Sequence, residues 1–365
     1  DANTGDLPEC IRRVGTMINW EEGSKIEVSP NKVRAKGMGL LWKSPAMPTN
    51  TDAGVILTFN EDASINLQTG IVEIGQGTFT ALAQIVAEKF KIPVDKVHVV
   101  EDTNTKPAPH DWATAASRSL MMAGRAAIEA SDDAIAQLKR TASIPLHCSP
   151  EDLEVGYGRI FLKDEPKIGI DMEKVVMGYV YPNGNAIEGQ VIGRGRYISR
   201  RLSGINPETG EGQPELEWTL GAQAIEVEVD LSDGSYNVLQ AVCCMDVGTL
   251  INPKLAHEQI VGGLAMGLSF ARNEGFLFNN REQVINDDLR SYKILRYGEH
   301  PKYQVEFLNT PQGDGPFGAR GLGEQGVIGM PGALSNALSR AIGKPLNALP
   351  LTPESIWKTI KEEDK

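Results

Sequence analysis

The sequence predicts an α+β fold of two lobes, in which mixed sheets are flanked by helices. Strand-like and helix-like segments follow one another without the regular βαβ rhythm of a parallel sheet, which favours α+β. The chain has 365 residues, of which 41% are hydrophobic, and can bury a large core. A stretch rich in glycine and proline turns divides it near the middle. We therefore expect an N-terminal segment over residues 1–36, a first lobe over 37–150, a connecting segment over 151–214 and a second lobe over 215–365.

The first 150 residues are expected to hold strands followed by two helices. A short amphipathic stretch near the start is typical of a helix, LPECIRRVGTMINWEEGSK. From Val33 the pattern predicts a meander of strands, VRAKGMGLLWK, GVILTF, ASINLQ and GIVEIGQG. Apolar residues at helical spacing predict a helix over residues 78–90, and the strand VHVVED follows it. Residues 114–138, rich in alanine and methionine, predict the longest helix.

The rest of the chain predicts further sheet and helix. Its middle holds short strands such as GRIFL and GQVIGRGRYI and a long charged loop, SRRLSGINPETGEGQPE. Two strands joined around Asp233 and Gly234 give a strong hairpin signal. Helices are predicted over residues 254–268 and 328–342 and in the last stretch, PESIWKTIKEE.

The net charge of the chain limits the classes of partner that it can bind. The formal net charge is -12 at pH 7, and both nucleic acid and anionic membranes would repel such a chain. The sequence contains no apolar stretch of about 20 residues that could span a membrane, and no basic-then-apolar leader at residue 1. We therefore expect a cytoplasmic protein that binds a small molecule or another protein, and neither nucleic acid nor a membrane.

The cysteines and histidines do not predict a metal site. None of the four cysteines, Cys10, Cys148, Cys243 and Cys244, belongs to a CxxC motif, and their spacing suits neither zinc nor an iron–sulfur cluster. We expect all four to be reduced packing residues. None of the five histidines lies four residues from another. Side chains of this chain are therefore not expected to hold a metal.

Three loops combine small residues with polar or charged ones immediately before a helix. The N–H groups at a helix start, with the positive end of the helix dipole, favour anions such as phosphate. Glycines also tolerate a positive φ and let a ligand approach the backbone. The residues concerned are Gly75, Gln76 and Gly77 in GQG, Thr114, Ala116, Ser117, Arg118 and Ser119 in TAASRS, and Gly321, Gly323 and Glu324 in GPFGARGLGEQGVIGM.

Each loop by itself has a plainer interpretation. GQG can be a simple turn, a serine-rich helix start is commonly a cap, and Glu324 can be a solvated loop acid. A fourth stretch, DVGTLINPKLAHEQIVGG, adds Gln259 within a helix, and its amide offers a donor and an acceptor to the edge of a flat heterocycle. The order of the four motifs along one chain is what makes them specific.

In this order the motifs resemble those of the molybdenum-binding subunit of the xanthine dehydrogenase and aldehyde oxidase family, the molybdenum hydroxylases. The resemblance runs from about Gly37 to Lys358 but covers only the C-terminal half of that family's usual subunit. It implies the family's two-lobed molybdopterin-binding fold. It also implies an oxidoreductase that hydroxylates an N-heteroaromatic compound, purine- or nicotinate-like, or oxidises an aldehyde, with water as the oxygen source.

The resemblance further implies roles for individual residues. Gln76 with its flanking glycines, the TAASRS residues, Gln259 and the glycines of the last loop would contact a molybdopterin cofactor, of which the cytosine dinucleotide is one form. Its phosphate would meet the hydroxyls and the helix-start amides, and its dithiolene would hold the molybdenum. Glu324 would be the general base that takes the proton from the attacking oxygen. The substrate pocket would include Trp42, Met47 and Trp112, although such side chains are more often core residues.

The half of the family's subunit that would precede these motifs is not in the sequence. Its own glycine–glutamine loop and its Phe-Arg-Gly segment do not occur before Asp1, and neither do iron–sulfur and flavin modules. We therefore expect a second chain that completes the active site, and further chains that carry iron–sulfur clusters and flavin. Two other functions stay open. One is a non-catalytic structural partner, against which the intact Glu324 argues, and the other is a nucleotide-binding module, which the lack of a P-loop disfavours.

Overall fold

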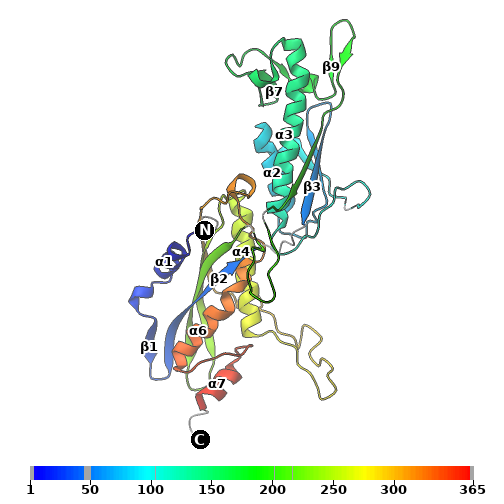
Figure 1. Cartoon of the computed structure of the whole chain (residues 1–365). Helices are drawn as coiled ribbons and strands as arrows, with labels where there is room; N and C mark the ends of the chain where they lie inside the picture. Colours follow the sequence, from blue (N-terminus) through cyan, green and yellow to red (C-terminus); the bar gives the residue numbers. More distant parts are fainter. Residues whose placement is uncertain (1–3, 45–50, 103, 201, 216, 362–365) are drawn as a thin grey trace. The chain divides into compact units, whose positions relative to one another are not determined.

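The chain folds into two units, and each is assembled from segments that lie far apart in the sequence (Figure 1). The computed structural model describes residues 4–44, 51–102, 104–200, 202–215 and 217–361. Unit 1 comprises Asp1–Ser44, Glu217–Pro311 and Leu322–Lys365, and unit 2 comprises Pro45–Leu216 and Gln312–Gly321.

These units divide the chain differently from the predicted lobes. The strand that begins near Val33 does not open a meander, because β2 (Lys32–Lys43) pairs along its length with β12 (Thr219–Asp230) in unit 1. Residues 151–214, predicted as a connecting segment, belong to unit 2. Pairing between strands so far apart in the chain leaves no local sequence pattern from which it can be predicted.

Unit 1 is a five-stranded sheet in the order β1-β2-β12-β13-β14. Strand β1 is Lys25–Ser29, β13 is Tyr236–Asp246 and β14 is Lys302–Leu308. All neighbours are antiparallel except β13 and β14, which are parallel. The predicted hairpin is confirmed, because β12 and β13 are joined by a turn in which Gly234 has a φ of 74°.

Helices cover both faces of this sheet. On one face α4 (Pro253–Arg272), α6 (Met330–Ile342) and α7 (Pro353–Lys361) contribute to the main core, and Figure 1 shows α6 running along β2. On the other face α1 (Leu7–Met17) packs against β12 and β13. Side chains of a strand alternate between faces, so the odd-numbered positions of β2 face α6 and the even-numbered ones face away from it.

Unit 2 packs two helices against a four-stranded sheet. The sheet has the order β11-β3-β4-β5, with β3 at Asp52–Phe59, β4 at Ile65–Thr69, β5 at Val97–Val99 and β11 at Ile192–Ile198. Helices α2 (Thr78–Phe90) and α3 (Ser119–Leu146) pack against each other, and α3 packs against β3 and β11. Smaller sheets complete the unit, with β6 at Leu153–Gly156, β7 at Arg159–Leu162, β8 at Gly169–Asp171, β9 at Tyr179–Val180 and β10 at Ala186–Ile187.

Most predicted helices are present, but two local predictions are wrong. The stretch GIVEIGQG is a loop rather than a strand. The long helix begins at Ser119 rather than at residue 114, because Ala116 and Ser117 have φ values of 54° and 64°, which a right-handed helix does not accommodate. It then continues to Leu146, well past the predicted end.

Two further predictions concern the cysteines and the membrane. The four cysteines form no disulfide, and Cys10, Cys243 and Cys244 are buried as packing residues. Within the described ranges, no helix combines the length and apolarity that crossing a bilayer requires.

Candidate functional site

Glu324 lies at the end of the glycine-rich loop, directly before the short helix α5 (Gln325–Ile328) of unit 1. Its Oε2 atom is 3.2 Å from Nζ of Lys43, the last residue of β2. The Glu324 side chain is 50% exposed, whereas that of Lys43 is only 18% exposed. The backbone N–H of Glu324 donates to Oε1 of Gln325 at 3.0 Å. The acid is therefore reachable from solvent while one of its oxygens is paired with a cation.

Two glutamines hold the backbone on either side of Glu324. From α4, Nε2 of Gln259 donates to the carbonyl oxygen of Gly323 at 2.6 Å. From β12, Nε2 of Gln223 donates to the carbonyl oxygen of Gly326 at 2.9 Å. Gln223 is fully buried, and its Oε1 accepts no hydrogen bond within the described part of the chain. A buried amide with an unsatisfied acceptor is uncommon in native proteins. Gln223 supports the loop through its Nε2 donor.

Glycines let α5 approach its neighbours at backbone distance. A Cβ atom added to Gly263 of α4 would lie 2.7 Å from Cα of Gly326. A Cβ atom added to Gly267 would lie 2.5 Å from the carbonyl oxygen of Val327. A Cβ atom added to Gly39 of β2 would collide with the carbonyl oxygen of Gly329. The segment after Glu324 is thus packed tightly between α4 and β2. This places Glu324 on a rigid scaffold.

The GQG loop of unit 2 is folded onto itself. Oε1 of Gln76 accepts from the N–H of Ile74 at 2.7 Å, and its Nε2 donates to the carbonyl oxygen of Val72 at 3.1 Å. Gly75 has a φ of 104°, which an L side chain rarely adopts, and a Cβ atom there would meet nothing within 4 Å. The space beside Gly75 is therefore open to a ligand that approaches the backbone.

Three amides at and before the start of α2 already donate to an acid of the same loop, and a phosphate contact there stays a prediction. The carboxylate of Glu73 accepts from the N–H groups of Gly75 and Gly77 through Oε1, each at 2.9 Å. It also accepts from the N–H of Phe79 at 3.0 Å through Oε2. An acid in this position accepts hydrogen bonds from N–H groups that the helix leaves unpaired, and the positive end of the helix dipole stabilises its negative charge.

The TAASRS segment lies beside this loop in unit 2. The hydroxyl of Thr114 accepts from the N–H of Val72 at 3.0 Å, so the two predicted motifs meet through that residue. Ala116 and Ser117 both have a positive φ directly before Ser119 opens α3. Successive N–H groups in such a turn form concavities that bind anions. A phosphate contact at this turn stays a prediction, and the N–H of Arg118, the next residue, already donates to the carbonyl oxygen of Ala115 at 3.2 Å.

Arg118, predicted as a cofactor contact, is bound within the fold of unit 2. Its guanidinium is fully buried, pairs with Asp111 at 3.0 Å and donates to the carbonyl oxygens of Asp52 and Ala113. It also lies 5.5 Å from the centre of the Trp112 ring. Burial raises the pKa of the Asp111 carboxyl, and the charge of Arg118 opposes that rise. These contacts give Arg118 a structural role, and a direct contact with a cofactor stays a prediction.

The three predicted substrate residues have different surroundings. Trp42 is 61% exposed and its ring lies 4.4 Å from that of Trp218, on the face of the unit 1 sheet opposite to Lys43. Trp112 is 44% exposed in unit 2. Met47 lies outside the described residues. A contact of these side chains with a substrate stays a prediction.

The predicted residues thus form two groups, one in each unit. Gln259, Gly323 and Glu324 lie together in unit 1, and the GQG and TAASRS residues lie together in unit 2. Gly321 is the last residue of the unit 2 segment that precedes Glu324. The role of each group in binding a cofactor stays a prediction.

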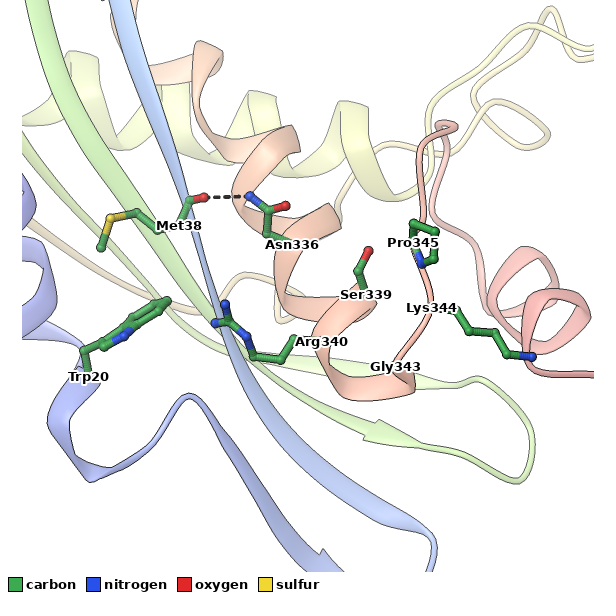
Figure 2. A pocket seen from close by; sticks show the side chains of 8 residues that line it. All are labelled: Trp20, Met38, Asn336, Ser339, Arg340, Gly343, Lys344 and Pro345. Atoms are coloured by element: carbon green, nitrogen blue, oxygen red, sulfur yellow. Dashed lines mark hydrogen bonds between the residues drawn. The ribbon is translucent and has the colours of Figure 1, made fainter.

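A pocket of about 630 Å³ in unit 1 is separate from these residues. Figure 2 shows Asn336 and Arg340 of α6 and Lys344 on one side, and Trp20 and Met38 on the other. Asn336 donates to the carbonyl oxygen of Met38 at 2.8 Å, and Arg340 lies 5.2 Å from the centre of the Trp20 ring. None of the predicted site residues lines this pocket.

Comparison with known proteins decides the family. A family model described as the molybdopterin cofactor-binding domain matches residues 13–301. The chain belongs to this family. The matched span of this molybdopterin cofactor-binding domain includes GQG, TAASRS and Gln259, and it ends before Glu324.

Two relatives are named as subunits of dehydrogenases. The chain is 28% identical over 360 residues to the putative xanthine dehydrogenase molybdenum-binding subunit XdhA of Escherichia coli K12, a match that covers 96% of this chain and 46% of the relative. It is 28% identical over 375 residues to the gamma subunit of the 6-hydroxypseudooxynicotine dehydrogenase complex of Paenarthrobacter nicotinovorans, covering 100% and 44%. The chain therefore spans about half the length of these relatives.

A solved structure confirms the predicted fold class. The chain is similar to quinoline 2-oxidoreductase from Pseudomonas putida 86 with a TM-score of 0.85 and 21% identity. The match covers 98% of this chain and 46% of the other. The mixed sheets and helices described above thus share the fold of that protein.

The donors of the site suit a molybdopterin cofactor. Among the residues that the structure describes, no three His, Cys, Asp or Glu side chains are grouped to hold a metal ion. A cofactor whose own sulfur atoms hold the metal needs only hydrogen-bond donors and acceptors from the protein. Within unit 2 the backbone N–H groups of the turn at Ala116 and Ser117 are of that kind, and so, within unit 1, is the side-chain amide of Gln259.

Sequence patterns missed three residues of this arrangement. Lys43, Gln223 and Glu73 act on the loops through contacts with partners that the sequence does not mark. Gln223 had one available signal, because it is a lone uncharged polar residue in the otherwise small and apolar stretch LGAQAI of β12. Lys43 and Glu73 had none, since lysines and glutamates at such places are usually solvated.

Proposed function

We propose that this chain is the molybdopterin-binding part of a molybdenum hydroxylase. The enzyme hydroxylates an N-heteroaromatic compound, purine- or nicotinate-like, or oxidises an aldehyde, and water is the source of the oxygen. Family membership and the names of the relatives support the cofactor and the reaction class. The observation that carries the proposal is the fixation of Glu324, because a solvent-reachable acid held this firmly has the properties of a catalytic base.

Each unit has its own candidate contacts to the cofactor. In unit 2, the turn at Ala116 and Ser117 and the hydroxyls of Thr114 and Ser119 would hold its phosphate. In unit 1, Gln259 would reach the pterin with Oε1 while its Nε2 keeps the bond to Gly323. The cytosine dinucleotide form is the one we propose. When bound, the cofactor supplies the oxygen atom derived from water and takes up the two electrons of the oxidation.

Glu324 performs the proton transfer. Its carboxylate accepts the proton that leaves the oxygen nucleophile as this oxygen bonds to an electron-poor carbon of the substrate. Efficient transfer requires the carboxylate to lie within hydrogen-bond reach of that proton. Gln259 and Gln223 contribute to this by fixing the backbone on both sides of the acid.

Partner chains complete the enzyme. The relatives are named as subunits, and this chain spans about half of their length. We propose that a polypeptide with the other half of the molybdenum subunit completes the active site. Further chains with iron–sulfur clusters and a flavin would accept the electrons. The acidic charge of this chain is consistent with partners other than nucleic acid.

The substitution Glu324→Gln tests the function directly. Glutamine preserves the shape of the side chain but cannot accept the proton, so turnover by the native complex should fall by at least about 10³-fold. The molybdenum and pterin contents of the variant should equal those of the wild type. Turnover is measured with nicotinate, hypoxanthine and benzaldehyde and a dye as electron acceptor. A Glu324→Gln complex that retains most of its activity would show that Glu324 is not the base.

A further inference from the structure

Lys43 is an unusual residue for its place in the sheet of unit 1. It ends the row of β2 positions that face α5 and α6, and the earlier members of that row are apolar residues or glycines. These are Val33, Ala35, Gly37, Gly39 and Leu41. A lysine at the end of such a row, with a side chain only 18% exposed, needs partners for its charge.

The Lys43 ammonium group contacts a carboxylate oxygen of Glu324 and a backbone oxygen. Nζ lies 3.2 Å from Oε2 of Glu324 and donates to the carbonyl oxygen of Ser44 at 3.1 Å. Most lysine ion pairs on a protein surface are weak because water and salt screen them. The pair of Lys96 and Asp62 is of that kind, with side chains 48% and 58% exposed. The lysine of the Glu324 pair is much less exposed.

The carboxylate of Glu324 needs a contact of its own to be fixed. Gln259 and Gln223 hold the backbone around Glu324, but a glutamate side chain still rotates about three bonds. A contact at a carboxylate oxygen restricts these rotations. Lys43 makes such a contact from β2, a strand that also packs against the segment after Glu324 through Gly39.

We infer that Lys43 is a positioning residue for the catalytic base. Its ammonium group binds Oε2 and so directs the Glu324 carboxylate toward the reacting oxygen. This inference rests on the proposed role of Glu324 as the base. Lys43 itself neither donates nor accepts the transferred proton, and it acts only through Glu324.

The first test measures the pair without relying on activity. The purified native complex is treated with an acetylating reagent, and the labelling of each lysine is followed by mass spectrometry. Lys43 should react slowly in the wild type and several-fold faster in Glu324→Gln, because the amide no longer pairs with the ammonium group. Lys96 is the matched control and should label equally in both. Equal labelling of Lys43 in the two complexes would overturn the inference.

The second test separates positioning from folding. Lys43→Met should lower kcat by about 10-fold to 100-fold, because a misdirected base reacts slowly. KM should change by less than about twofold, and the molybdenum content should stay at the wild-type level. Lys43→Arg keeps the cation and should restore most of kcat, which a purely structural role would not predict. Lys96→Met serves as the control and should have wild-type kinetics.

The outcomes distinguish this inference from the proposed function. If Glu324→Gln stays active while the labelling of Lys43 rises, the pair exists but Glu324 is not the base, and the proposed function fails. If Glu324→Gln is inactive while Lys43→Met keeps the wild-type kcat, the base is correct and the positioning role is overturned.

Discussion

Arg118 illustrates how one residue of a predicted cofactor motif can have a structural role in the fold. The guanidinium and the Asp111 carboxylate are both almost fully buried, with 0% and 2% of their side chains exposed. The pair also links TAASRS to the start of β3 through the carbonyl oxygen of Asp52. Removing one member of a buried pair leaves an uncompensated charge, which is strongly destabilising.

We therefore predict that Arg118→Met destabilises the protein by about 3–5 kcal/mol. Urea unfolding at pH 7 measures this loss. The double variant Arg118→Met/Asp111→Leu should recover much of it, because no charge is then left buried. Equal losses in the single and double variants would contradict the account.

The pH dependence of that variant follows from Asp111. Burial raises the pKa of the folded carboxyl above its unfolded value, so the folded state binds a proton more readily than the unfolded state. Stability from this group is then greatest below the unfolded pKa and falls as pH rises toward the folded one. The loss caused by Arg118→Met should therefore shrink when unfolding is measured near pH 4 instead of pH 7.

At the residue scale, sequence could predict what local patterns encode. The motifs GQG and TAASRS are recognisable because each consists of adjacent residues. The contacts of Lys43 and Gln223 are different, because they join Glu324 and Gly326 to strands that lie far away in the chain. Glu73 was missed for a further reason, since a carboxylate that binds its own loop looks in sequence like any exposed acid.

At the element scale, the crossing of α4 and α5 places Glu324. Gly263 and Gly326 meet with no room for a side chain, whereas a Cβ atom on the neighbouring Gly262 would meet nothing within 4 Å. Both Gly262 and Gly263 lie inside α4. The two positions differ in packing while sharing the same helix, which makes them a matched pair.

Alanine at these two glycines should therefore have opposite effects. Gly263→Ala forces α5 away from α4 and should cost about 1–3 kcal/mol of stability. Gly262→Ala should stabilise the protein by up to about 1 kcal/mol, because alanine is the better helix former. Thermal unfolding of the two variants compares them. If both shift the midpoint in the same direction, the backbone contact does not constrain the crossing.

Elements with a strong local pattern were predicted well, and others were not. The helix over residues 78–90 agrees with α2 because apolar spacing and the following proline fix both of its ends. The start of α3 was missed because two residues without special sequence character, Ala116 and Ser117, adopt a positive φ. GIVEIGQG looks like a strand in sequence, but Glu73 and Gln76 turn it into a loop by binding its backbone.

At the scale of the whole molecule, the sheet of unit 1 explains why the lobe boundaries could not be predicted. Its second and third strands come from residues 32–43 and 219–230, and all of the sheet of unit 2 lies between them in sequence. Local patterns identify each strand but contain no information about such a partner. The fold class could be predicted, because it depends on the mixture of elements alone.

We propose that this chain and a second polypeptide hold the cofactor together. The most direct test of this proposal is the molybdenum and pterin content of the complex purified under native conditions from cells that make it, compared with the chain expressed alone. The account predicts about one molybdenum atom and one pterin per chain in the complex, and far less in the isolated chain. A complex without molybdenum, or with a nucleotide bound in its place, would contradict the account.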